Sequence, residues 1–254
     1  MSPVLFNVYM DDLNYELRRT GVVCSMSGTL INSVSYADDM VLLAPSVAAM
    51  RRLLSVCEKY AGHHNMQYNT DKSEYIIFES ANSPSVVIPL SLNGRSLRRA
   101  EEVKYLGHII NSRLTDEADI ERQRRSITVR ANMLARRFQR CSDNVKRQLF
   151  LTFCTSVYTV EVWAVHTVGA GQRMRVQYNN AWRALFRLSP RCSANAMFVE
   201  GRAPSWGALL RQRTAALRQR VDASTNSVLQ AAREWPASPL HARWRELHAP
   251  FSRP

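Results

Sequence analysis

Two adjacent carboxylates lie between two apolar runs in the stretch Ser33-Val34-Ser35-Tyr36-Ala37-Asp38-Asp39-Met40-Val41-Leu42-Leu43-Ala44. Before the pair, Leu30, Val34 and Tyr36 fall on even positions, so they would share one face of a strand. After the pair, residues 40–44 are apolar without a break, which is typical of a strand that is buried on both faces. The pattern predicts a β-hairpin with Asp38 and Asp39 at its tip.

Carboxylates that lie side by side at a hairpin tip repel each other unless a cation lies between them. Mg²⁺ binds carboxylate oxygens together with the phosphates of a substrate. Two such ions can hold both the attacking and the leaving oxygen of a phosphoryl transfer. The pair therefore indicates a site for Mg²⁺, or Mn²⁺ in its place. The alternative is a polar Asp-Asp turn that only links two strands.

The residues around the pair carry a family resemblance. Tyr36-Ala37-Asp38-Asp39 resembles the Tyr-x-Asp-Asp signature of reverse transcriptases. Further pieces, which are similar to reverse transcriptases of non-LTR (LINE-type) retrotransposons, follow in the order of that family. They are Ser2-Pro3-Val4-Leu5-Phe6, Asn69-x-x-Lys72-Ser73, Tyr105-Leu106-Gly107 and Glu161-Val162-Trp163. The resemblance covers roughly residues 2–210, and several motifs in order are more specific than a lone Asp-Asp pair.

The resemblance implies an α+β fold. Residues 1–113 would form part of a polymerase palm, an antiparallel sheet with helices, and residues 114–221 an all-helical, thumb-like domain. The implied activity is that of an RNA-directed DNA polymerase. Its partners would be an RNA template, a DNA primer and deoxynucleoside triphosphates, and its cofactor Mg²⁺ or Mn²⁺.

The resemblance also implies roles for single residues. Asp38 and Asp39 would be the catalytic metal ligands, and Lys72 would hold a phosphate or protonate the leaving pyrophosphate. An ordinary exposed turn lysine is the alternative for Lys72, and a β-bulge glycine is the alternative for Gly107. The residues implied in nucleotide and primer binding are Tyr36, Ala37, Tyr105, Leu106 and Gly107.

A second Tyr-x-Asp-Asp, Tyr9-Met10-Asp11-Asp12, precedes the first. Phe6, Met10, Leu13 and Leu17 recur around it with helical spacing. Consecutive residues of a helix point about 100° apart. Asp11 and Asp12 are therefore expected to be solvated helix carboxylates and not metal ligands.

The chain has a formal net charge of +13, and 30 of its 34 basic residues are arginines. Such a charge attracts polyanions, and arginine can donate two hydrogen bonds to the oxygens of one phosphate. An arginine-biased genome is the alternative explanation. The N-terminus does not resemble a signal peptide, and no apolar run approaches the ~20 residues of a membrane span. Five scattered cysteines indicate free thiols. An intracellular protein, nuclear or cytoplasmic and not secreted, is expected.

The hydrophobic period changes from strands to helices near Thr115, a candidate N-cap. Before it, Ser46 is a candidate helix N-cap, residues 91–97 read as a hairpin and residues 103–110 as one strand. After it, helices are predicted from about residues 115, 142, 172 and 204. The tail, residues 222–254, is predicted to be loose with one possible helix, Asn226–Trp235.

The first of these helices carries arginines opposite its apolar stripe, which contains Ile120, Ile127, Ala131, Leu134 and Phe138. Almost no acidic residues follow Glu121 to offset them. The pattern favours contact with a nucleic-acid backbone, and a solvated face is the alternative. The arginines on this face are Arg122, Arg125, Arg136 and Arg140.

Polymerases of the resembled family need a third carboxylate on a strand upstream of Ser-Pro-x-Leu-Phe. In this sequence Met1 directly precedes Ser2-Pro3. Two hypotheses follow: a polymerase fragment that is inactive by itself, or a basic nucleic-acid-binding remnant without catalytic function. An unrelated α+β binding module would require several motifs to occur in family order by chance.

Overall fold

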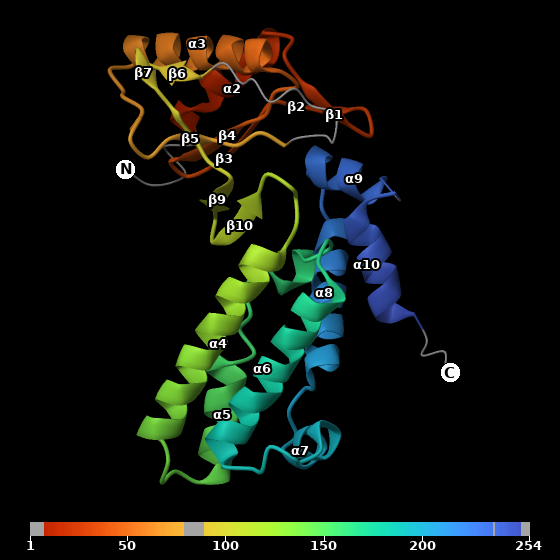
Figure 1. Cartoon of the computed structure of the whole chain (residues 1–254). Coiled ribbons are helices and arrows are strands. Elements are labelled where there is room, and N and C mark those ends of the chain that lie inside the picture. The colour runs from red at the N-terminus through yellow and green to blue at the C-terminus, as the bar shows by residue number, and fades with distance from the viewer. Residues whose placement is uncertain (1–7, 79–88, 236, 250–254) are drawn as a thin grey trace. The chain divides into compact units, whose positions relative to one another are not determined.

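The computed structural model describes residues 8–78, 89–235 and 237–249, and the chain divides into two compact units (Figure 1). The first unit comprises residues 1–101 and 224–235, and the second comprises residues 102–223 and 236–254. The chain thus leaves the first unit after Glu101, returns to it for one short segment, and ends in the second. Helices and strands are both present, which is compatible with the predicted α+β class.

The first unit contains short strands that pair two by two. Three pairs are antiparallel hairpins, and the pair β5–β8 is parallel. The strands are β1 (Cys24–Met26), β2 (Thr29–Ile31), β3 (Ser33–Tyr36), β4 (Asp39–Leu42), β5 (Glu74–Tyr75), β6 (Ser91–Leu92), β7 (Arg95–Ser96) and β8 (Arg98–Arg99).

The prediction that residues 40–44 are buried on both faces is wrong, because each of them is only half-buried. Met40 and Leu42 pack on the helices of the unit. Leu30 and Val34, on the even positions, are exposed. The reason is that β4 pairs only with β3 among the described residues, so a single layer of helices covers the hairpin.

Three helices complete the first unit: α2 (Asp11–Arg19), α3 (Val47–His63) and α9 (Ser227–Arg233). Leu13 and Leu17 of α2 are fully buried against α3. Asp11 and Asp12 lie in the exposed first turn of α2, as predicted. The hydroxyl of Ser46 accepts a hydrogen bond from the Ala49 N–H, so the predicted cap of α3 is confirmed.

The second unit begins with a hairpin and continues as helices. Residues 103–110, predicted to be one strand, form two strands joined by a turn at Leu106 and Gly107. No strand occurs between Thr115 and Val221, as predicted. The elements are β9 (Glu102–Tyr105), β10 (His108–Asn111), α4 (Glu117–Arg137), α5 (Asp143–Phe153), a short 3₁₀ helix (Val160–Val162), α6 (Val168–Phe186), α7 (Ala194–Glu200), α8 (Trp206–Asp222) and α10 (Pro239–His248).

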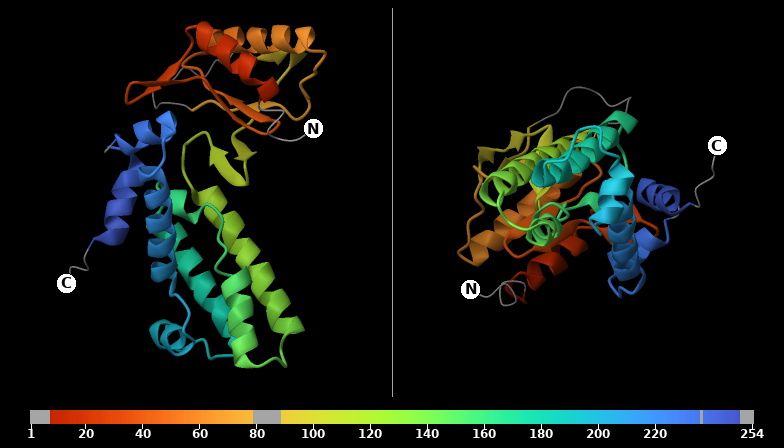
Figure 2. Two further views of the ribbon diagram at one scale, coloured as in Figure 1. Left: turned by 180° about the vertical axis from the view of Figure 1, so that it is seen from behind. Right: turned by 90° about the horizontal axis from the view of Figure 1, so that it is seen from below.

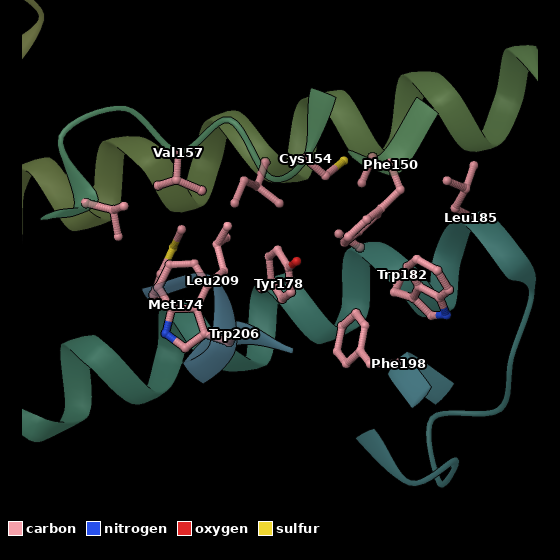
Figure 3. Packing of buried hydrophobic residues seen from close by; sticks show 14 of the residues in the cluster. Phe150, Cys154, Val157, Met174, Tyr178, Trp182, Leu185, Phe198, Trp206 and Leu209 are labelled. Atoms are coloured by element: carbon pink, nitrogen blue, oxygen red, sulfur yellow. The ribbon is translucent and has the colours of Figure 1, made fainter. Parts of the chain in front are cut away.

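Aromatic side chains form the centre of the helical core (Figure 3). The ring of Phe150 meets Trp182 edge to face at 4.8 Å between centroids, and Tyr178 stacks on Phe198 at 5.4 Å. Such pairs add to the free energy of burial. The Tyr178 hydroxyl donates to the Pro204 carbonyl at 2.9 Å, so the core contains no unsatisfied phenol at this point. Helices α4 and α6 run side by side in both views of Figure 2.

The start of α4 and the helix content of the tail differ from the prediction. Helix α4 begins at Glu117, and Thr115 does not cap it, because its hydroxyl and N–H are bonded to the Asn111 side chain. The tail holds two helices, α9 and α10, where one was predicted. Pro239 is the first residue of α10, a position that needs no N–H donor.

All five cysteines are free thiols, in agreement with prediction. Within the described ranges, no helix is long and apolar enough to cross a membrane.

Candidate active site and nucleic-acid interface

The hairpin predicted around Asp38 and Asp39 is present. Strands β3 and β4 pair antiparallel, with Tyr36 opposite Asp39, so Ala37 and Asp38 are the two turn residues. Ala37 has a φ of 51°, in the left-handed region that favours glycine. Both carboxylates are exposed. The turn thus presents two negative charges to solvent, beside the exposed ring of Tyr36.

A buried asparagine fixes the base of this hairpin, and sequence reasoning missed it. Asn32 is 3% exposed. Its amide donates to the carbonyls of Leu17, at 2.8 Å, and Val22, at 3.1 Å, at the end of α2. The backbone carbonyl of Asn32 accepts a hydrogen bond from the Leu43 N–H at 2.8 Å. A polar residue inside an apolar strand pattern was the available signal, because buried polar groups need partners.

The carboxylate pair could supply some, but not all, of the ligands of a Mg²⁺ or Mn²⁺ ion. No group of three or more His, Cys, Asp or Glu side chains gathers anywhere in the described ranges. Mg²⁺ is often held by only one or two carboxylates, together with waters and substrate phosphates. Asp38 and Asp39 therefore suit an ion that is shared with a phosphate-bearing substrate, and they do not form a closed metal cage.

Lys72 lies in a well-ordered turn of the first unit. The side-chain oxygen of Asn69 accepts hydrogen bonds from the backbone N–H groups of Asp71 and Lys72. The Ser73 hydroxyl donates to the backbone carbonyl of Asn69 at 2.8 Å. The Lys72 side chain is exposed, and no ion pair joins it to another residue that the structure describes. It is therefore available to an anion.

Three of the five residues implied in nucleotide and primer binding, Tyr105, Leu106 and Gly107, lie at the turn of the β9–β10 hairpin. Leu106 has a φ of 45° and Gly107 of 82°. A Cβ on Gly107 would lie 3.0 Å from Cε1 of Tyr158. A larger residue at position 107 would strain the left-handed backbone and displace the Tyr158 ring. Tyr158 was not singled out in the sequence, because a ring that approaches from fifty residues further on leaves no local pattern.

A fully buried carboxylate, Asp119, lies behind this turn. Each of its oxygens accepts more than one hydrogen bond, from strand β10, from α4 itself and from the segment that precedes α6. The donors are the Ile109 N–H at 3.2 Å, the Arg122 guanidinium at 2.6 and 2.8 Å, the Thr159 hydroxyl at 3.0 Å and the Trp163 indole at 2.9 Å, with Nδ1 of His108 at 3.2 Å.

The surroundings shift the pKa values of two carboxyl groups in this cluster in opposite directions. For Asp119, burial raises the pKa, but hydrogen bonds from His108, Trp163 and Arg122 outweigh it and hold the pKa well below the ordinary value. For Asp116, burial raises the pKa further than the N–H groups of Val165 and Ala164 lower it. Asp119 is thus an ionised structural group at neutral pH.

Two of the four predicted phosphate-contacting arginines have carboxylate partners. Arg122 is bound to Asp119, and Arg125 shares Glu121 with Arg124. The prediction considered only the acidic residues after Glu121, so it overlooked Asp119 and Glu121 as partners of these arginines. Arg136 and Arg140 are exposed and form no ion pair with the part of the chain that the structure describes. They are the two that remain available to phosphate.

The positive charge is concentrated in one part of the chain. Residues 102–223 contain 21 arginines and lysines against nine acidic residues, whereas residues 1–101 contain nine against ten. The attraction for polyanions therefore comes from the helical second unit. The carboxylate pair lies in the nearly neutral first unit.

Part of this chain matches a known protein family. Residues 1–110 match the family model "Reverse transcriptase (RNA-dependent DNA polymerase)". The resemblance to reverse transcriptases is confirmed. The chain is also similar to the "RNA-directed DNA polymerase from mobile element jockey" of Drosophila funebris, with 24% identity over 97% of this chain and 28% of that protein. The Drosophila melanogaster protein of the same name is 28% identical over 45% of this chain and 13% of its own length.

The reverse transcriptase match covers the Asp38–Asp39 hairpin, Lys72 and the Leu106–Gly107 turn. Asp119 itself and the exposed arginines lie beyond it, whereas His108 and Ile109, which contact Asp119, lie inside it. The alignment with the Drosophila funebris protein covers 97% of this chain. This chain spans less than a third of the length of either relative.

Proposed function

We propose that the chain is the palm and thumb portion of an RNA-directed DNA polymerase of a non-LTR retrotransposon. Residues 1–113 correspond to part of the palm and residues 114–221 to the thumb. One observation carries the proposal. The Tyr-Ala-Asp-Asp sequence forms a hairpin that exposes both carboxylates, and it lies inside the region that matches reverse transcriptases.

In this proposal each site residue acts on a primer, a template or a nucleoside triphosphate. Asp38 and Asp39 hold Mg²⁺, or Mn²⁺ in its place, which when bound neutralises phosphate charge and activates the attacking primer oxygen. Lys72 binds phosphate or gives a proton to the leaving pyrophosphate. Tyr36 and Ala37 border the nucleotide. The Tyr105–Gly107 turn holds the primer end.

We further propose that the 254 residues alone do not polymerise DNA. Two-metal transfer needs ions held about 3.5–4 Å apart, and by resemblance this takes a third carboxylate from a preceding strand. The pair at the hairpin tip has no such third partner in the described ranges. Positioning of template and triphosphate also supplies a large share of the rate acceleration.

Primer extension on an RNA template with Mg²⁺ or Mn²⁺ tests both parts. The purified chain should give no product, and the chain extended by its upstream reading frame should give product that Asp38→Asn or Asp39→Asn abolishes. Asp11→Asn, in the helical Tyr-x-Asp-Asp, is the matched control and should have no effect. Extension by the 254 residues alone would refute inactivity. Extension insensitive to Asp38→Asn would refute the catalytic assignment.

A non-catalytic nucleic-acid-binding protein is the second candidate, and the charge of residues 102–223 favours it. It predicts binding of primer–template with no extension even after the upstream segment is restored. The same extension experiment therefore separates the two.

A further inference from the structure

The exposed ring of Tyr158 covers the turn between β9 and β10. Tyr158 is 57% exposed and Leu106 is 38% exposed. The ring approaches Gly107 so closely that any added Cβ would lie 3.0 Å from it. The Tyr158 ring thus lies against the turn and faces solvent, and Leu106, the residue before Gly107, is also exposed.

The backbone has a positive φ both at Leu106 and next to Tyr158. Leu106 has a φ of 45° and Thr159, the neighbour of Tyr158, a φ of 64°. Left-handed conformations are uncommon for residues other than glycine, and rarest for β-branched residues such as threonine. Strained residues persist only where their surroundings fix them, and they cluster at functional sites. Two such residues converge here from positions more than fifty residues apart.

The Asp119 cluster supplies that fixation. The carboxylate of Asp119 binds the Ile109 N–H of the hairpin and the Thr159 hydroxyl at once. The Gln123 amide donates to the Tyr158 carbonyl at 2.9 Å. The turn and the ring are therefore tied to the same face of α4 before any ligand binds, so a ligand meets a preformed surface.

We propose that Tyr158 and Leu106 form a platform on which the terminal base of a bound nucleic-acid strand stacks. The inference rests on the proposed function, because it adds Tyr158 to the primer-holding turn. Aromatic side chains stack bases of any sequence. The platform lies in the part of the chain that carries the positive charge, and Lys104, on β9, is exposed near the turn. This charge favours a polyanion over an apolar protein segment.

Equilibrium binding of a DNA primer on an RNA template tests the platform with the full chain. The probe carries 2-aminopurine, an adenine analogue quenched by stacking, at the primer 3′ end or at an internal position. Wild type and Tyr158→Phe should quench the terminal probe only. Tyr158→Leu and Tyr158→Ala should lose the quenching and bind about tenfold more weakly, within the range for one lost base stack. Gly107→Ala, which displaces the ring, should lose quenching as well.

Tyr15→Ala is the control, because Tyr15 is an exposed tyrosine of the first unit. It should match wild type in quenching and affinity. Equal melting temperatures of Tyr158→Leu and wild type show that the fold is kept. Unchanged quenching and affinity in Tyr158→Leu overturn the platform and leave the proposed function standing. Failure of the wild type to bind the primer–template overturns both.

Discussion

Among single residues, Asp119 shows how a buried charge is compensated. Replacement by Asn keeps the volume, leaves Arg122 without its anion and removes the carboxylate that accepts from His108. Breaking a buried pair in this way costs about 3–5 kcal/mol, so Asp119→Asn should lower the free energy of unfolding by about that amount at pH 7. Urea unfolding at several pH values measures it. Asp143→Asn, on an exposed carboxylate, should change little.

The pH dependence of this loss follows from the direction of the pKa shift. The pKa of Asp119 is lowered in the folded state, so its stabilisation is complete above the unfolded value of about 3.9 and declines as pH falls below it. The difference between wild type and Asp119→Asn should narrow from pH 5 to pH 2. The raised pKa of Asp116 acts oppositely, since its contribution is lost as pH rises, but it is present in both proteins. A difference independent of pH would contradict the assignment.

The role of Asp119 could not be predicted from the sequence. Asp119 reads as an ordinary acidic residue in the first turn of a helix, where the helix dipole favours it. Its donors come from Ile109, Thr159 and Trp163, on segments up to forty-four residues away. By contrast, the position of Asp38 and Asp39 at a hairpin tip could be predicted, because strand-forming apolar residues lie on either side of the pair.

Among elements, α4 carries the clearest test of backbone binding. The helix ends at Arg137, so Arg136 lies in its last turn and Arg140 lies in the turn that follows, not on the helix as predicted. Both are exposed without a carboxylate partner in the described structure, whereas Arg122 is bound to Asp119. Each phosphate neutralised contributes about 0.9 to the slope of log affinity against log salt for duplex DNA. Affinity falls as salt rises, so the slope is negative. The double replacement Arg136→Gln and Arg140→Gln should make it less steep by up to about 1.8, as measured by salt titration of duplex binding.

Arg122→Gln is the matched comparison. It should reduce stability and leave the salt slope nearly unchanged, because Asp119 already neutralises the arginine. If the double variant keeps the parental slope, the arginine face of α4 is only a solvated surface. If Arg122→Gln makes the slope less steep by as much as the double variant does, the ion pair with Asp119 opens on binding.

Elements were predicted well where local signals agree with the fold. Helix α3 has both an apolar stripe and a serine cap, and the β6–β7 hairpin has Asn93-Gly94, the preferred residues for its turn. The β9–β10 hairpin was missed because Leu106 occupies a left-handed turn position that leucine rarely adopts. The pattern around it remained apolar, so it read as one continuous strand.

For the molecule as a whole, the path of the chain could not be predicted. The segment 224–235 belongs to the first unit although 122 residues of the second precede it. Its helix α9 packs on β1 and β2, with Ala231 buried. Contacts between positions about 200 residues apart produce no local pattern of hydrophobic residues from which they could be predicted. The tail therefore read as loose, and its structural role appeared only in the fold.

This path predicts separate effects for two truncations. An isolated two-stranded hairpin is marginally stable, so β1–β2 should depend on α9. A chain that ends at Ala223 lacks both α9 and α10, and its β1–β2 amides should lose hydrogen-exchange protection by about tenfold or more. A chain that ends at Trp235 keeps α9 and should retain that protection. It lacks Trp244, whose indole donates to the Glu161 carbonyl at 3.2 Å, so faster exchange should appear around residues 160–163 instead. Equal exchange of β1–β2 in the two truncated chains would show that α9 does not stabilise the first unit.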